Sequence, residues 1–158
     1  MLSWIRQRVG QFAFGSLAMG TKAMLAPVAF GAHAMLFDAQ GRVGLARHSY
    51  RGGLSFPGGG VKRGEPPERA ILRELSEELG TVHSDPPMLF GLYTRPSGWA
   101  TNLIALYCLT NAEVEFRPSL EVRELIFVDP ADPPPQASLG TRRRLAEYLN
   151  KTTPTPFW

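Results

Sequence analysis

Three glutamates near the middle of the chain have the spacing that puts carboxylates on one face of a helix. Glu74, Glu77 and Glu78 occupy positions i, i+3 and i+4, and helical residues with this spacing are neighbours. Three ionised carboxylates so close together repel one another, and a divalent cation removes that repulsion. Ligation by oxygen alone suits Mg²⁺ or Mn²⁺, and Mg²⁺ usually takes water and phosphate oxygens as its remaining ligands. The spacing therefore predicts a metal site.

The surrounding residues supply the helix that this site needs. Residues 66–79 carry apolar side chains at helical spacing, which gives one core-facing stripe. Pro66 and Pro67 suit the start of a helix, where a missing N–H costs little, and Gly80 suits its C-terminal end. The apolar stripe consists of Ile71, Leu72, Leu75 and Leu79.

Two further features flank the glutamates. The run Gly58–Gly60 has no side chains that would keep a metal or phosphate away from the backbone, so Gly59 and Gly60 are candidate substrate contacts. Arg73 lies four residues before Glu77 and can pair with it, which would hold that ligand in place. The competing interpretation is a solvated glutamate face with ordinary i,i+4 salt bridges. The fixed spacing of the whole segment favours the metal site.

A longer pattern runs from Gly59 to Thr81, which reads GGVKRGEPPERAILRELSEELGT. Glu65 follows Gly59 after five residues, and Arg73 and Glu74 follow Glu65 after seven more. An apolar residue, a spacer, two further glutamates, another spacer and a glycine complete the pattern. It resembles the Nudix box, so the chain is similar to Nudix hydrolases. Thr81 departs from the aliphatic residue usual at the last position, but this change removes no metal-binding group.

The resemblance implies both a fold and a reaction. The fold would be an α/β fold of the Nudix type, an α/β/α sandwich with a mixed sheet. The reaction would be hydrolysis of a nucleoside diphosphate linked to another group, assisted by Mg²⁺ or alternatively Mn²⁺. Glu74, Glu77 and Glu78 would bind the metal, and Arg73 would orient them. Glu65 would support the ligands from outside or act as a minor ligand.

A carboxylate must also accept the proton of the attacking water. Family members differ in which carboxylate does so. Glu74, Glu77 and a glutamate beyond the box, here Glu121 or Glu124, are all candidates. The more ordinary role for Glu121 and Glu124 is an exposed turn and a strand edge.

The residues that select the substrate lie outside the box. Arg47, Arg51 and Arg95 are candidate phosphate clamps. Trp99 lies in a predicted loop, where it either stacks on a base or packs over the end of the sheet. Phe56 is expected in the core.

The first prediction for the substrate is ADP-ribose or a nucleotide sugar. Pro96 lies sixteen positions after Gly80, as in the ADP-ribose pyrophosphatase branch of the family, but residues 97–102 lack the acidic residue that this branch places there. RNA 5′ ends or dinucleoside polyphosphates are the alternative, although no interleaving of aromatic and basic residues supports it. The other alternative is a non-catalytic nucleotide-binding module. Such a module should have lost box glutamates, and none is missing here.

The composition fits a single globular domain that binds an anion. The 158 residues suffice for a substantial core, and the net charge of +3 suits an anionic substrate without implying nucleic acid. Cys108, the single cysteine, is predicted to be a buried thiol, and the lack of a cysteine or histidine cluster argues against zinc. The run Arg142–Arg144 is predicted to be a solvated helix face. No apolar run reaches the ~20 residues of a membrane span, and a cytoplasmic location is expected.

The chain divides into three predicted parts. Residues 1–25 are predicted to be a helical extension that packs on the domain or on a second subunit of a homodimer. A membrane-surface helix and a secretion signal are the alternatives. Residues 26–151 would form the catalytic domain, and residues 152–158 a flexible tail unless its aromatic side chains dock. The expected strands cover residues 28–37, 43–48, 88–94, 102–110 and 122–128, with loops at 50–54, 95–101 and 129–135 and a closing helix over 139–150.

Overall fold

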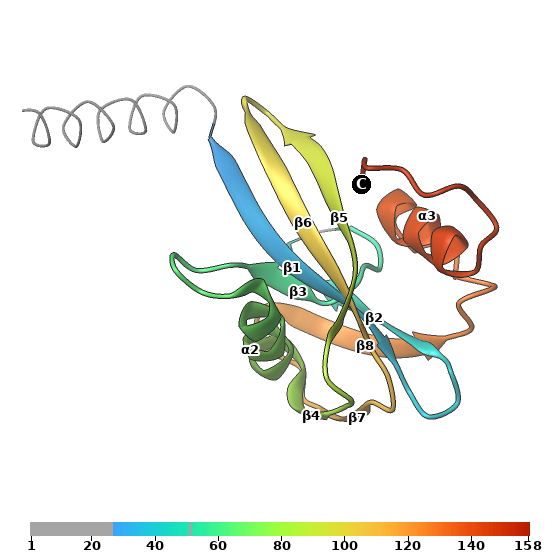
Figure 1. Ribbon diagram of the computed structural model, residues 1–158. Coiled ribbons are helices and arrows are strands. Elements are labelled where there is room, and N and C mark those ends of the chain that lie inside the picture. The colour runs from blue at the N-terminus through green and yellow to red at the C-terminus, as the bar shows by residue number, and fades with distance from the viewer. Residues whose placement is uncertain (1–26, 51) are drawn as a thin grey trace, which may run out of the picture.

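A mixed sheet forms the centre of the molecule, with one helix on each face (Figure 1). The computed structural model describes residues 27–50 and 52–158, so the predicted extension over residues 1–25 lies outside the described residues. No helix among the described residues is long and apolar enough to cross a membrane. In chain order the elements are β1 (Val28–Phe37), β2 (Val43–His48), β3 (Gly58–Gly60), α2 (Pro67–Leu79), β4 (Gly80–His83), β5 (Met88–Ser97), β6 (Ala100–Leu109), β7 (Glu113–Phe116), β8 (Val122–Val128) and α3 (Leu139–Tyr148).

Strand β1 lies at the centre of the sheet, whose order is β5-β6-β1-β2-β8. It pairs in parallel with β6 and antiparallel with both β2 and β3. Leu36 and Phe37 pair with β2, whereas residues 31–33 pair with β3. The glycine strand β3 is therefore fixed against the first half of β1, inside the domain.

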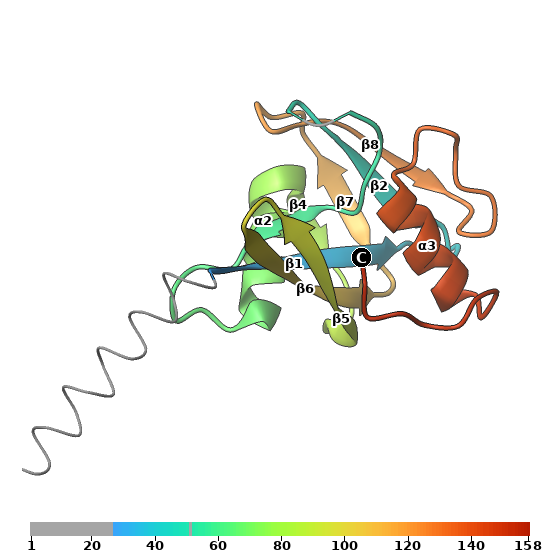
Figure 2. The ribbon, with the colours of Figure 1, turned by 90° about the horizontal axis from the view of Figure 1, so that it is seen from above.

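Alternate side chains of β1 point to opposite faces of the sheet, and each face has its own core. Ala32 and Ala34 pack with the apolar residues of α2 on one face. Met35 and Phe37 pack with Leu145 of α3 on the other. The two views show α2 and α3 on opposite sides of the sheet (Figures 1 and 2). The α/β/α sandwich with a mixed sheet predicted from the sequence is confirmed.

The structure differs from the prediction in the β5–β6 hairpin and in three short strands. β5 and β6 continue through the expected loop and remain paired up to Ser97 and Ala100. The turn is confined to Gly98 and Trp99, and Gly98 has a φ of 60°, which favours glycine. β3 consists of glycine alone, so no apolar alternation indicates it. β4 and β7 pair only with each other, in a second, two-stranded sheet.

The basic run on α3 corrects the prediction of a solvated face. Arg144 is fully buried, and its guanidinium lies 4.1 Å from the ring centroid of Tyr93 and 2.7 Å from a Glu147 oxygen. Arg142 donates to two backbone carbonyls of the preceding loop. Burial of the Arg144 charge is tolerated because a carboxylate and an aromatic face compensate it.

The segment 152–158 lies along β5 and places an aromatic ring against the core. The Thr94 N–H donates to the Pro156 carbonyl at 2.8 Å, and the Trp158 N–H donates to the Thr94 carbonyl at 3.0 Å. Trp158 packs on the core cluster of the α3 face, whereas Phe157 is 62% exposed. A flexible tail was expected only if its aromatic side chains did not dock, and Trp158 does dock.

Candidate active site

Helix α2 carries the three predicted glutamates, and their exposure differs. The helix starts at two prolines and ends at Gly80. Gly80 has a φ of 92°, and a Cβ there would lie 2.8 Å from the Glu115 carbonyl oxygen, so this exit from the helix requires glycine. The side chains of Glu74, Glu77 and Glu78 are 12%, 54% and 2% exposed.

Arg73 connects the helix to the loop and the strand before it. Its Nε and Nη2 atoms donate to Glu65 at 2.8 and 2.9 Å, and Nη2 also donates to the Gly60 carbonyl at 2.9 Å. Its Nη1 atom donates to Glu74 at 2.6 Å and to Glu77 at 3.0 Å. The expected pairing of Arg73 with Glu77 is present, and one guanidinium orients two of the predicted ligands.

Glu78 is held in the interior by other partners. Its Oε1 lies 3.0 Å from His48 Nε2, and its Oε2 accepts a hydrogen bond of 2.8 Å from the Gly58 N–H. His48 is itself buried, and its Nδ1 lies 3.3 Å from Ser55 Oγ. Strand β2 thus supplies a buried partner for a carboxylate on α2.

The Glu74 carboxylate lies directly against the backbone of β3. A Cβ at Gly59 would contact both carboxylate oxygens and would lie 2.6 Å from Glu74 Cδ. A Cβ at Gly60 would meet nothing within 4 Å. Gly58 has a φ of 130°, and a Cβ there would lie 2.8 Å from His33 Cα. Gly58 is therefore needed for pairing with β1, and Gly59 for the approach of Glu74.

The pKa values of the carboxylates reflect these different surroundings. Burial raises the pKa of Glu74, although the hydrogen bond and charge of Arg73 oppose that change. The hydrogen bond from Arg73 lowers the pKa of Glu65 to about 2. The contact with Glu65 in turn raises the pKa of Arg73. A further cation nearby would therefore favour the ionised form of Glu74.

The donor set suits a hard divalent cation. Glu74 and Glu77 both lie within hydrogen-bond distance of Arg73 Nη1, so their oxygens converge on one cationic group. Carboxylate oxygens are the ligands that Mg²⁺ and Mn²⁺ prefer. In residues 27–50 and 52–158 no three acidic, histidine or cysteine side chains form one ligand cluster, and Glu78 is engaged with His48. The residues present fit such a cation on the chemistry of their oxygens.

Two cavities lie in this part of the molecule, one beside β3 and the other beside the segment 152–158. The first, of about 240 Å³, is lined by Gly58–Gly60 and by residues of β1, β5 and β6. The second, of about 180 Å³, reaches Trp158. Both are lined by His33, Arg95 and Ile104, so they adjoin, and we call the two together the hollow. Its size and mixed lining are those of a small-molecule site, and its Gly59 end adjoins Glu74.

The structure brings some of the predicted substrate contacts to this hollow and not others. Gly59 and Gly60 line the first cavity, and Arg95 lines both. Trp99, at the β5–β6 turn, is 81% exposed and lines neither cavity. Arg51 lies outside the described residues.

The remaining predicted residues lie on β2 and near β8. Arg47 forms an ion pair of 2.7 Å with Glu124, where β2 pairs with β8. Glu121 is exposed in the turn before β8. None of the three lines either cavity.

Two residues that the sequence analysis did not assign to the site are part of it. His48 contacts Glu78 from a strand thirty positions earlier, and no local spacing indicates such a pair. Trp158 lines the second cavity, and the centroid of its ring lies 5.7 Å from that of His33. The only sequence signal for Trp158 is an aromatic residue in a segment otherwise predicted to be a tail.

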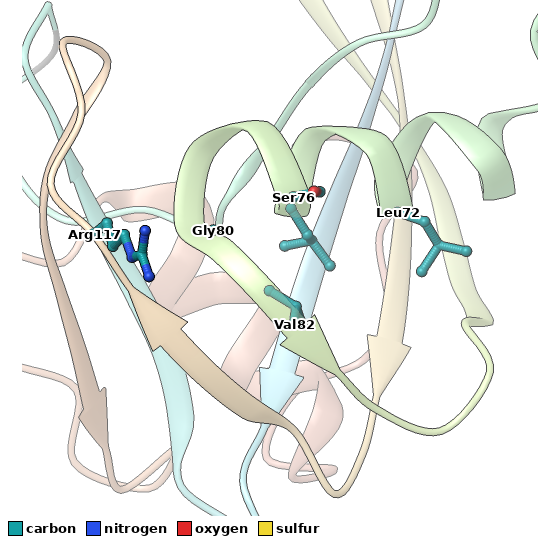
Figure 3. A pocket seen from close by; sticks show the side chains of 6 residues that line it. Leu72, Ser76, Gly80, Val82 and Arg117 are labelled. Carbon is teal, nitrogen blue, oxygen red and sulfur yellow. The ribbon is translucent and has the colours of Figure 1, made fainter.

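A larger hollow, of about 440 Å³, lies between α2 and the β4–β7 pair (Figure 3). Its lining includes Leu72, Ser76, Val82 and Arg117. It lacks the glycines of β3 that line the first cavity, so this hollow is not the candidate active site despite its size.

Comparison with known proteins agrees with this fold and identifies the family. A family model described as NUDIX domain matches residues 27–148, and the chain belongs to that family. A crystal structure of a MutT NUDIX hydrolase from Burkholderia pseudomallei is 25% identical, with a TM-score of 0.66 over 75% of this chain and 95% of that one. The shared fold thus includes nearly all of that protein.

Curated relatives match over shorter stretches. A protein of Hahella chejuensis named RNA pyrophosphohydrolase is 38% identical over 65 residues, which is 41% of this chain and 38% of that protein. A protein of Escherichia coli named 8-oxo-dGTP diphosphatase is 45% identical over 42 residues, which is 27% of this chain and 30% of that protein. The matches span less than two fifths of the length of these relatives.

Proposed function

We propose that this Nudix protein hydrolyses the pyrophosphate bond of a nucleoside diphosphate derivative and requires a divalent cation. The observation that carries the proposal is the contact of the Glu74 carboxylate with the side-chain-free Gly59, which lines the first cavity of the hollow. A carboxylate-rich cation site then adjoins the place where a ligand fits. The intact set of box glutamates favours an enzyme over a non-catalytic binding module.

Each box residue has a distinct part in this proposal. Glu74, Glu77 and Glu78 would hold the cation, which when bound neutralises negative charge on the pyrophosphate and lowers the pKa of a water molecule. Arg73 fixes the orientation of Glu74 and Glu77, and Glu65 anchors Arg73. The general base would be Glu74 or Glu77, since both lie beside the cation site. The bare backbone of β3 lets a phosphate approach closely.

Two substrate classes fit this site. ADP-ribose or a nucleotide sugar has the support of Pro96 alone. RNA 5′ ends and nucleoside triphosphates have the support of the names of the two curated relatives. Both classes contain a nucleoside diphosphate unit, and Arg95 lies where it would contact the phosphates of either. We favour RNA 5′ ends and nucleoside triphosphates, because their support comes from aligned sequences.

The test is a hydrolysis screen with the full chain. The panel contains ADP-ribose, a nucleotide sugar, nucleoside triphosphates including 8-oxo-dGTP, a dinucleoside tetraphosphate and a 5′-triphosphorylated RNA. We expect at least one to be cleaved at a pyrophosphate bond with Mg²⁺ or Mn²⁺, and not with EDTA. Full turnover of every accepted substrate in EDTA would overturn the role of the cation. Binding of these compounds without any turnover would instead support the non-catalytic module.

A further inference from the structure

We propose that Trp158, from the segment 152–158, forms the wall on which the base of the bound nucleotide packs. The inference rests on the proposed function, because it concerns the second cavity of the same hollow, which the glycines of β3 do not line. It assigns base recognition to a residue outside the Nudix box and outside the matched region, which ends at residue 148.

The order of residues along the hollow gives the direction of the ligand. The first cavity is lined by Gly59, which lies against Glu74, and the second cavity adjoins the first at His33 and Arg95. Trp158 lines only the second cavity. A nucleotide whose pyrophosphate lies beside β3 and Arg95 therefore extends its base toward Trp158.

The chemistry of the second cavity suits a heteroaromatic base. Phe56 and Trp158 supply aromatic surface, and Ser55, Ser138 and Arg95 supply polar groups. A base has an apolar face and a polar edge, so it can satisfy both kinds of lining at once. A purely aliphatic ligand would leave the polar groups without partners.

The indole is held in place before any ligand arrives. Its ring centroid lies 5.7 Å from that of Tyr93 and 6.4 Å from that of Phe56. The backbone N–H of Trp158 donates to the Thr94 carbonyl, and Arg143 donates to the Trp158 backbone oxygen at 3.1 Å. A wall that is already ordered does not lose rotamer freedom on binding, which favours affinity.

A buried network on α3 fixes the segment that carries the indole. Glu147 is 3% exposed and accepts hydrogen bonds from the Thr155 N–H at 3.1 Å and from Tyr93 Oη at 3.2 Å. It also pairs with the buried Arg144 at 2.7 Å. The segment 152–158 is therefore held by Glu147 of α3 as well as by its hydrogen bonds to β5.

Gly140 makes room for the indole on the first turn of α3. A Cβ at this position would lie 2.8 Å from Trp158 Cδ1 and would also meet Nε1. Gly140 has no positive φ, so alanine is compatible with its backbone and favours the helix. The substitution Gly140→Ala therefore shifts the indole without removing it.

The experiment measures binding of two probes to the full chain in the presence of Mg²⁺. The nucleotide probe is α,β-methylene-ADP, and its guanine counterpart is measured in the same way. The second probe is methylene diphosphonate, which has the phosphonate groups but no nucleoside. Trp158→Ala should weaken binding of the nucleotide probe by about tenfold to a hundredfold, the range for loss of a stacked base. Trp158→Phe should recover part of the loss, and Gly140→Ala should weaken binding as well. Affinity for methylene diphosphonate should stay unchanged in all three variants.

The control is Phe157→Ala, which removes the exposed neighbouring ring from the same segment and should leave both affinities unchanged. Thermal melting of each variant identifies any that fail to fold. If Trp158→Ala does not fold, the binding measurements on Trp158→Phe and Gly140→Ala still test the inference. Equal weakening of both probes in the folded variants would assign Trp158 a structural role only and overturn the inference. A loss in Trp99→Ala with none in the Trp158 variants would also overturn it. If the wild type hydrolyses nucleotides and the Trp158 variants keep their affinity, the inference fails while the proposed function stands.

Discussion

At the scale of single residues, the position of one carboxylate depends on the absence of one side chain. Glu74 can lie against β3 only because Gly59 has no Cβ. Its pKa is raised mainly by burial in that position. Gly59 also lines the first cavity, so the burial of Glu74 and its nearness to that cavity both depend on this glycine.

The first prediction concerns Gly59→Ala. The new methyl group would push the Glu74 carboxylate aside, and since that group is the mobile end of a side chain, the fold should survive. Turnover should fall by about tenfold to a hundredfold, as for other changes that misplace a metal ligand. Gly60→Ala meets open space and should lose clearly less activity. The measurement is the initial rate of phosphate release by both variants. Equal losses of activity would contradict the different roles given to Gly59 and Gly60.

The second prediction concerns Glu74→Gln. Loss of a ligand charge should reduce turnover by about a hundredfold or more. Because burial raises the folded-state pKa of Glu74, the ionised carboxylate is less favourable in the folded protein than in the unfolded chain, and a neutral amide removes that cost. The melting temperature in EDTA should therefore rise. Glu68→Gln, an exposed change on the same helix, should alter neither quantity. A lower melting temperature for Glu74→Gln would refute the electrostatic argument.

Which of these residues the sequence predicts depends on whether their partners are local. The pairing of Arg73 with Glu77 follows from helical spacing, and it is present. His48 and Trp158 reach the site through the sheet and through β5, so their positions depend on tertiary pairing that no short window contains. The sequence therefore predicts the three box glutamates together, but it does not predict that Glu78 contacts His48 and the Gly58 N–H.

At the scale of elements, one side chain joins the helix to the loop and strand that precede it. Arg73 on α2 contacts Glu65 in the loop and the Gly60 carbonyl on β3. These contacts use the Nε and Nη2 atoms of the planar guanidinium, and Nη1 contacts Glu74 and Glu77. A lysine cannot reproduce this arrangement.

The third prediction is therefore that Arg73→Lys keeps the positive charge but loses the hydrogen bonds that depend on the planar guanidinium. Turnover should fall by about tenfold or more, and the loop over residues 61–66 should become easier to cleave with a protease. Arg69→Lys, on an exposed position of the same helix, is the matched control and should behave as wild type. Wild-type kinetics in Arg73→Lys would show that charge alone is sufficient.

The sequence predicts an element well where it has a long apolar pattern. β1 is apolar on both alternating faces because a helix covers each face of the sheet, and its predicted range agrees with the observed one. β3 has no side chains, and β4 and β7 are stabilised by pairing with each other. These three strands are defined by their partners and not by their own composition, which is why they were not predicted.

At the scale of the whole molecule, α3, β5 and the segment 152–158 meet in the buried group of Tyr93, Arg144 and Glu147. The fourth prediction is that this group makes the protein sensitive to alkali. Burial raises the pKa of Tyr93 to about 12 from its usual 10.0. A raised folded-state pKa favours the protonated form, so its contribution to stability is complete below pH 10 and is lost as the pH rises toward 12.

Chemical denaturation at several pH values measures this loss. Tyr93→Phe cannot ionise, so its stability should decline less steeply between pH 10 and 12. The pKa of Cys108 is also raised, to about 11, and contributes to the decline in both proteins. The difference between wild type and Tyr93→Phe therefore isolates the tyrosine, and parallel curves would contradict the prediction.

The fifth prediction separates residues 1–25 from the chemistry. The matched domain begins at residue 27 and β1 begins at Val28, and the hollow and the box glutamates lie entirely within the part that follows. Deletion of residues 1–25 should therefore leave cation-dependent turnover within about twofold of the full chain, because the residues assigned to the chemistry all belong to the matched domain. Solubility or subunit association should change instead, as measured by light scattering. A truncated protein that melts like the full chain but has lost turnover would show that the extension completes the active site.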